Sequence, residues 1–432
     1  MKRDIDARLL QWKESVDHKP LIVRGARQVG KSWSISEFGR SFTGRTHLVN
    51  LEKRPDWHGI FELNLDAKRI LAELEIVLNN PIRPGEDLLF IDEIQACPKA
   101  ISALRYFFEQ VPGLHVICAG SLLEFALRDL PFPVGRVQLM DMYPMHFAEF
   151  LEATGQSMLA NVILSRPEKI SETIHKSILE SLKIYFDIGG MPACVAYYAE
   201  TRSILRVREI QDDLLATMRQ DFLKYTPYVN TNCLNDILSA VAGSTGQQIS
   251  YTRLSQHYTS PTNKKAFDLL ITARVIYKVA CISPLSLPLR EGASLKKFKA
   301  LFLDIGLLSR LQGVDMGYRT DYHSLFRGAI AEQFVGQELV ASRKGIVYYW
   351  AREAKSSQAE IDFLIDREGV LIPIEVKSGA SGRLKSLHLL LNEHAEIPHG
   401  YILSEGAYGQ IPDQRLTYMP IYFAGYLGRG DG

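Results

Sequence analysis

Residues 21–32 read LIVRGARQVGKS, an apolar run followed by a loop with a glycine near each end. The loop matches the pattern GxxxxGK[ST] in full, and its members are Gly25, Ala26, Arg27, Gln28, Val29, Gly30, Lys31 and Ser32. The glycines let backbone N–H groups turn inward toward phosphate, and the helix expected from about Gly30 adds its positive dipole end. In such a loop the lysine reaches the β- and γ-phosphates and the serine ligates Mg²⁺. The sequence therefore predicts a site for ATP and Mg²⁺.

A second motif makes a chance glycine loop a poor explanation. Residues 88–93 read LLFIDE, a buried-strand run that ends in two acids. Asp92 suits a magnesium-associated carboxylate, and Glu93 suits a group that orients the attacking water. A protein that binds nucleotide without hydrolysing it is the alternative, and Glu93 disfavours it.

Short apolar runs alternate with helical patterns from Pro20 onward. The runs are PLIVRG, THLVNL, DLLFIDEI, HVICAG and VQLMDM. This alternation predicts parallel strands joined by crossover helices, a doubly wound α/β sheet in a P-loop domain over residues 1–155.

Two further residues fit a nucleotide site less specifically. Ser121 follows a predicted strand and could sense the γ-phosphate, or it could simply cap a helix. Arg136 could be an arginine finger given to its own site or to a neighbouring subunit, which would favour a nucleotide-dependent homo-oligomer, or it could be an ordinary surface arginine.

Residues 156–320 are predicted to be mostly helical. Three helical patterns and two apolar pieces over about 233–310 outline a winged-helix-like part, with an ordinary helical bundle as the alternative. Lys264 and Lys265 are the clustered charges on the would-be recognition helix, which leaves DNA binding a weak prediction.

Residues 321–432 return to an α/β pattern, with strands at AEIDFLID and VLIPIEVKS. Strand alternation places Asp362 on one face of the first strand, and Glu375 and Lys377 together on one face of the second. Glu332 lies on the buried stripe of a preceding helix. Buried acids need a partner or a metal.

These four residues resemble the D…(D/E)xK site of restriction-endonuclease-like phosphodiesterases, in which carboxylates hold Mg²⁺ and a lysine stabilises or activates water. The resemblance implies that Glu332, Asp362 and Glu375 are the metal ligands of a nuclease site that acts on DNA or RNA. A salt-bridge network on a degenerate nuclease fold is the alternative.

The segments GARQVGKS, LLFIDEIQ, CAGSLL, VGRVQLMDMYPMHFAEFL, FDIGGMPACV and ALFLDIGLL resemble prokaryotic AAA-type ATP-binding proteins with an uncharacterised C-terminal domain. The resemblance covers essentially the whole chain. It implies an ATPase with an additional catalytic glutamate, and Lys31, Ser32, Asp92 and Glu93 fall on its motif positions. It implies no substrate.

The composition limits which partners and which cellular compartment we expect. The 432 residues carry a formal net charge of +1, which removes the simplest argument for a nucleic-acid or membrane partner. Five widely spaced cysteines favour a reducing compartment, and we expect a cytoplasmic protein with no membrane contact. Two functions remain: an ATPase whose nucleotide state controls a nuclease-like module, or an ATP-driven switch whose inactive nuclease-like domain binds a protein or DNA.

Overall fold

The computed structural model describes residues 1–120, 123, 135–225, 229–313, 324–343, 346–352, 359–377 and 384–429. The chain divides into two compact units, Lys2–Tyr143 and Pro144–Gly432. Within the described ranges, no helix combines the length and the apolarity that a bilayer span requires.

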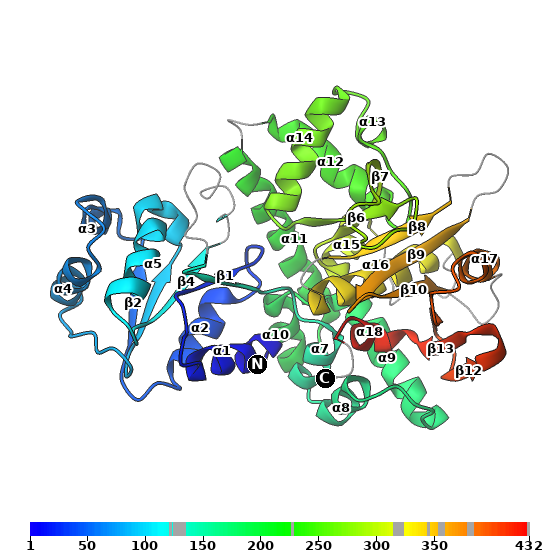
Figure 1. Ribbon diagram of the computed structural model, residues 1–432, viewed down its shortest axis with the longest axis horizontal. Helices are drawn as coiled ribbons and strands as arrows, with labels where there is room; N and C mark the ends of the chain where they lie inside the picture. Colours follow the sequence, from blue (N-terminus) through cyan, green and yellow to red (C-terminus); the bar gives the residue numbers. More distant parts are fainter. Residues whose placement is uncertain are drawn as a thin grey trace. The chain divides into compact units, whose positions relative to one another are not determined.

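The first unit holds a five-stranded sheet in the order β2-β3-β4-β1-β5, with every neighbouring pair parallel (Figure 1). The strands are β1 (Leu21–Arg24), β2 (Thr46–Asn50), β3 (Leu88–Asp92), β4 (His115–Gly120) and β5 (Gln138–Asp141). The helices are α1 (Asp4–Glu14), α2 (Lys31–Gly39), α3 (His58–Glu62), α4 (Ala67–Leu78) and α5 (Pro98–Gln110). The predicted parallel α/β sheet is confirmed.

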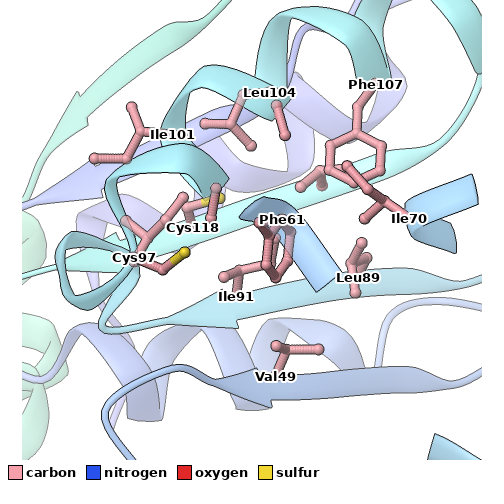
Figure 2. Packing of buried hydrophobic residues seen from close by; sticks show 14 of the residues in the cluster. Val49, Phe61, Ile70, Leu89, Ile91, Cys97, Ile101, Leu104, Phe107 and Cys118 are labelled. Carbon is pink, nitrogen blue, oxygen red and sulfur yellow. The ribbon is translucent and has the colours of Figure 1, made fainter. Parts of the chain in front are cut away.

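Alternation along the strands distributes their side chains between the two faces of this sheet. Leu89 and Ile91 of β3 belong to one apolar cluster with Ile101 and Leu104 of α5, and Figure 2 labels all four among the side chains of this cluster. Helix α2 contacts β3 and β4. The carboxyl ends of the parallel strands lie at one edge, where ligands bind in open α/β sheets.

The second unit contains an eight-stranded mixed sheet in the order β12-β13-β11-β10-β9-β8-β6-β7. Its strands are β6 (Ile276–Ile282), β7 (Ala293–Phe302), β8 (Tyr348–Ala351), β9 (Glu360–Arg367), β10 (Val370–Val376), β11 (Gly400–Ser404), β12 (Gly409–Ile411) and β13 (Leu416–Pro420).

The helices of this unit mostly precede its sheet along the chain. They are α7 (Phe147–Ala153), α8 (Ser157–Leu164), α9 (Glu172–Ile188), α10 (Pro192–Thr201), α11 (Ile204–Asp221), α12 (Thr231–Gly243), α13 (Tyr251–Leu254), α14 (Ser260–Thr272), α15 (Ile305–Leu311), α16 (Ser324–Ser342), α17 (Lys385–Glu393) and α18 (Ala424–Arg429). Helix α16 packs against β7 and β10.

One helical pattern ends earlier than its sequence suggests. The apolar spacing of KKAFDLLITARVIYKV predicts a helix, yet α14 stops at Thr272 and β6 begins at Ile276. Arg274 between them has φ 60°, a left-handed conformation that ends a helix. Periodicity alone does not separate a short apolar strand from the end of a helix.

The two strands expected to form a wing are part of the C-terminal sheet. Strand β6 pairs with β7 antiparallel and with β8 parallel, so the sheet continues from residues of the middle region into the C-terminal region. The proposed division of the chain at residues 155 and 320 stays a prediction.

Candidate functional site

The loop between β1 and α2 has the backbone that its glycines permit. Gly30 caps α2 with φ 96°, a conformation that side chains other than glycine rarely adopt. At Gly25 an added Cβ would lie 2.3 Å from the carbonyl oxygen of Met142, so the close approach of β1 to the end of β5 requires glycine there. Both motif glycines therefore have a physical reason in the fold.

The side chain of Lys31 lies folded over this loop. Its ammonium donates hydrogen bonds of 2.9 Å to the carbonyl oxygens of Gly25 and of Ala26, and the residue is only 8% exposed. The loop thus keeps a buried positive charge where the motif is expected to receive phosphate.

Ser32 and Asp92 meet although 60 residues separate them in sequence. The Ser32 hydroxyl lies 3.1 Å from each carboxylate oxygen of Asp92, and the Asn50 amide donates to the same carboxylate at 3.3 Å. Burial raises the pKa of Asp92, while the Ser32 hydroxyl lowers it and nearby Glu93 raises it further. A hydroxyl and a carboxylate oxygen are the hard ligands that Mg²⁺ prefers, so these two residues fit the predicted ion.

The neighbour of Asp92 is held by a residue that the motif does not include. Glu93 has a left-handed backbone (φ 50°), and its carboxylate accepts a hydrogen bond of 2.5 Å from the amide of Gln95. The amide oxygen of Gln95 packs against Gly120, where an added Cβ would lie only 2.3 Å from it. The Gln95 side chain therefore crosses the end of β4. Sequence reasoning missed Gln95 and Asn50. Their positions just after β3 and at the end of β2 are the signals that could have found them.

The two less specific residues have different outcomes. Arg136 donates to the Glu109 carboxylate at 3.1 Å, and its side chain is 47% exposed. Its role as an arginine finger stays a prediction. Ser121 lies outside the described residues.

In the second unit, the predicted acids gather in what we call the acidic cluster, whose members come from α16, β9, β10 and the residue after β10. The members are Glu332, Glu360, Asp362, Glu375 and Lys377, together with Lys299 from β7. Glu360 lies two residues before Asp362 on β9, so strand alternation puts both on one face. Lys299 was not predicted, although a lysine inside the apolar run of β7 was a signal.

Lys299 is the centre of the acidic cluster. Its ammonium lies 2.7 Å from a Glu360 oxygen, 3.1 Å from Glu332 and 3.3 Å from Asp362. Its side chain is 3% exposed. Burial lowers the pKa of Lys299, but the charges of Asp362, Glu332 and Glu360 outweigh burial and raise it well above its ordinary value.

The remaining pair lies beside this centre. Lys377 donates to one oxygen of Glu375 at 2.5 Å, and the second Glu375 oxygen is buried without a hydrogen-bond partner among the described residues. Burial raises the pKa of Glu375, Asp362 raises it further, and Lys377 acts in the opposite direction. Burial likewise raises the pKa of Glu332.

This arrangement bears on the predicted metal. Two of the three expected ligands, Glu332 and Asp362, direct oxygens at the Lys299 ammonium. A divalent ion would bind the same oxygens at roughly 2.0–2.6 Å, inside the space that the ammonium fills. A divalent ion at this face therefore does not fit while Lys299 occupies it.

Three family models match successive parts of the chain. Residues 17–151 match a family described as an AAA domain. This region is an AAA-type P-loop ATPase domain. Residues 179–317 and 327–423 match two domains of unknown function, DUF8612 and DUF4143. No curated protein matches the chain.

Three solved structures illustrate how distantly this chain resembles known folds. The Walker-type ATPase PABY2304 of Pyrococcus abyssi is 16% identical with a TM-score of 0.46, over 72% of this chain and 95% of that one. Aeropyrum pernix ORC1 in complex with DNA is 12% identical with a TM-score of 0.31, over 72% and 93%. The Thermotoga maritima RuvB Holliday junction branch migration motor is 14% identical with a TM-score of 0.29, over 65% and 90%. These similarities carry no functional conclusion for this chain.

Proposed function

We propose that this chain is a Mg²⁺-dependent ATPase whose nucleotide state controls a nuclease-like C-terminal module that acts on nucleic acid. The observation that carries the ATPase is the contact of the Ser32 hydroxyl with both oxygens of Asp92, at 3.1 Å each. It unites the two motifs at the carboxyl edge of the parallel sheet. When bound there, Mg²⁺ neutralises phosphate charge.

Each residue of the site has a separate task in this proposal. Lys31 leaves the loop carbonyls that it now contacts and binds phosphate oxygens instead. Glu93 orients the attacking water, and Gln95 fixes its carboxylate. A correctly placed base contributes roughly 10²–10⁴-fold to a rate, so most of the hydrolysis should depend on Glu93.

Phosphate release from ATP with Mg²⁺ tests the ATPase. We expect Lys31→Ala and Glu93→Gln to lose it, and Glu62→Gln, a change at an exposed glutamate, to keep it. Trp33 follows Ser32 and is 50% exposed, so its fluorescence should report ATP binding in Glu93→Gln. Unchanged release in both site variants would assign hydrolysis to another site.

A second candidate function is a switch that binds without cutting. In it, ATP hydrolysis changes the affinity of an inactive nuclease-like domain for DNA or for a protein partner. The contacts of Lys299 with Glu332, Glu360 and Asp362 favour this candidate over cleavage. The restriction-endonuclease-like fold itself rests on the sequence resemblance and on the α-β-β-β-α-β order from α16 to β11.

Cleavage of mixed DNA and RNA with Mg²⁺ or Mn²⁺, with and without ATP, separates the two candidates. Cleavage that disappears in Asp362→Ala and changes in Lys31→Ala would establish an ATP-governed nuclease. Intact ATP hydrolysis with no cleavage under any condition would favour the switch and turn the search toward binding partners.

Nucleic acid would be contacted first by the winged-helix-like part. Its elements follow the order α12, α13, α14, β6, β7, and an isolated bridge joins Ile249 to Phe298 of β7. Lys264 and Lys265 are exposed on α14 and are available to phosphate. This part supplies the proposed contact to DNA.

A homo-oligomer completes the proposal. Arg136 is exposed enough to reach a neighbouring subunit if its contact with Glu109 opens. An arginine supplied in trans makes hydrolysis depend on protein concentration. Hydrolysis per chain that stays constant over a wide dilution series would exclude this role.

A further inference from the structure

We infer that the ammonium of Lys299 is the resident cation of the acidic cluster and excludes a divalent metal from it. This inference rests on the second candidate function, in which the C-terminal module binds without cutting. It assigns to a lysine the place that the predicted site gives to Mg²⁺.

The position of Lys299 is fixed by the strand that carries it. Three residues along β7, the backbone of Phe302 is held on both sides by the amide of Gln333, which accepts its N–H at 2.9 Å and donates to its carbonyl at 2.8 Å. Gln333 neighbours Glu332 on α16 and is fully buried. The strand with the lysine and the helix with the carboxylate are therefore tied together directly.

Helix α16 also approaches β7 closely. An added Cβ at Gly336 would lie 2.5 Å from a side-chain carbon of Leu301, so only glycine leaves room for this spacing. Together with the amide of Gln333, this contact keeps α16 against β7. Lys299 is thus a built part of the cluster, unlike a surface lysine that can turn away into solvent.

The hydrogen-bonding capacity of Lys299 matches its surroundings. An ammonium has three donors and no acceptor. Three carboxylates, from Glu332, Glu360 and Asp362, lie within 3.3 Å of it, and its side chain is 3% exposed. Its ammonium also lies over the ring of Tyr349, 5.4 Å from the ring centre. The charge is paired on every side without any need for water.

A metal and this ammonium exclude each other. The ammonium lies against one oxygen of Glu332 and one of Asp362, and a divalent ion bound to the same two oxygens would be repelled by it at contact distance. Without the Lys299 ammonium, the carboxylates of the acidic cluster would have one described lysine beside them, Lys377, which pairs with Glu375. Such a group of acids either protonates or takes up a cation from solution.

Manganese binding to the full chain without nucleotide tests this inference. The variants are Lys299→Met, Lys299→Met combined with Asp362→Asn, Asp362→Asn alone, Lys299→Arg, and Lys296→Met as a matched control. Lys296 lies on the same strand and is exposed. Calorimetric titration with Mn²⁺ gives stoichiometry and affinity, and any binding by Ser32 and Asp92 is common to all variants.

We expect Lys299→Met to gain about one Mn²⁺ per chain that depends on Asp362, whereas the native chain binds no Asp362-dependent Mn²⁺. The gain should disappear when Asp362→Asn is added, and Lys296→Met should behave as the native chain. Lys299→Arg should remain closed to Mn²⁺, because it keeps a cation in place.

One result overturns the inference: a Mn²⁺ bound by the native chain that Asp362→Asn removes. This comparison uses the native lysine, so it decides the question even if Lys299→Met does not fold. Phosphate release from ATP, measured on the same samples, tests the proposed ATPase activity separately. Loss of ATPase activity can therefore be told apart from Mn²⁺ binding at the acidic cluster.

Discussion

The amide of Gln95 donates a hydrogen bond of 2.5 Å to the carboxylate of Glu93. The two residues are separated by one position at the end of β3, and the same amide lies over Gly120 at the end of β4. The carboxylate expected to orient water is therefore anchored between two neighbouring parallel strands. This anchor gives the first prediction.

We expect Gln95→Ala to lower kcat for ATP hydrolysis by about tenfold while KM stays near its native value, because the variant loses orientation of Glu93 and no contact to nucleotide. Steady-state phosphate release measures both constants. Gln138→Ala, at an exposed glutamine of β5, is the control. Equal losses in kcat and in ATP affinity would instead show a general collapse of the site.

His115 should make the protein sensitive to acid. Burial, and then nearby His18, lowers the pKa of His115 to about 4, and the ring stacks on His18 at 4.0 Å. Because this pKa lies below the value of about 6.5 in the unfolded chain, the unfolded state binds more protons between pH 6.5 and 4. The neutral ring's contribution is present above pH 6.5 and is lost as pH falls toward 4.

We expect His115→Phe to remove about 1–3 kcal/mol of this acid-dependent loss in the free energy of unfolding. A phenyl ring fits because His115 already makes edge contacts with Trp12 and Phe42 and because its Nδ1 has no hydrogen-bond partner among the described residues. Urea unfolding at pH 5 and pH 7 measures the effect. His257→Phe, at an exposed histidine, should keep the native pH dependence.

Asp304 is a structural carboxylate that α15 and the α9–α10 connection depend on. It is fully buried, and it accepts the N–H of Gly190 at 2.6 Å and that of Leu307 at 3.0 Å. We expect Asp304→Ala to lower the free energy of unfolding by roughly 2–4 kcal/mol, because two buried donors lose their acceptor.

An exposed helix-capping aspartate, Asp66, serves as the control for the buried Asp304. Asp66 accepts the N–H of Arg69 at 2.8 Å at the start of α4, but it is exposed. Asp66→Ala should cost only about 1 kcal/mol, since water replaces the lost acceptor. Equal losses in both variants, measured by urea unfolding, would contradict the account of Asp304.

The proposed DNA contact predicts a specific salt dependence. If Lys264 and Lys265 each neutralise a phosphate, replacing both by alanine should weaken DNA binding and reduce the slope of log affinity against log salt by about 2. Fluorescence anisotropy at several salt concentrations measures the slope. The same change at Lys68 and Lys99, two exposed lysines of the first unit, should leave it unchanged. A slope unaffected by Lys264 and Lys265 would exclude α14 as the contact.

Most of the features that could be predicted from the sequence lie in short segments of the chain. Strand β3 and its two acids were predicted from six consecutive residues. This was possible because the apolar run, the acid pair and the P-loop are each recognisable from neighbouring residues alone. The partnership of Ser32 with Asp92 also followed, since the carboxyl ends of parallel strands share one edge. The end of α14 at Thr272 was not foreseen, because apolar spacing beyond it suits a helix and a strand equally.

The sequence by itself determined the parallel α/β sheet of the first unit and predicted the residues of the proposed nucleotide site, because both depend on local patterns of two or three strands. Only the tertiary structure decided what the C-terminal acids meet. Lys299 lies 33 residues from Glu332 and 63 from Asp362, and no motif joins them. It enters their cluster because β7 and α16 pack together, and a long-range ion pair of this kind is fixed by strand order and packing, which spacing along the chain does not encode.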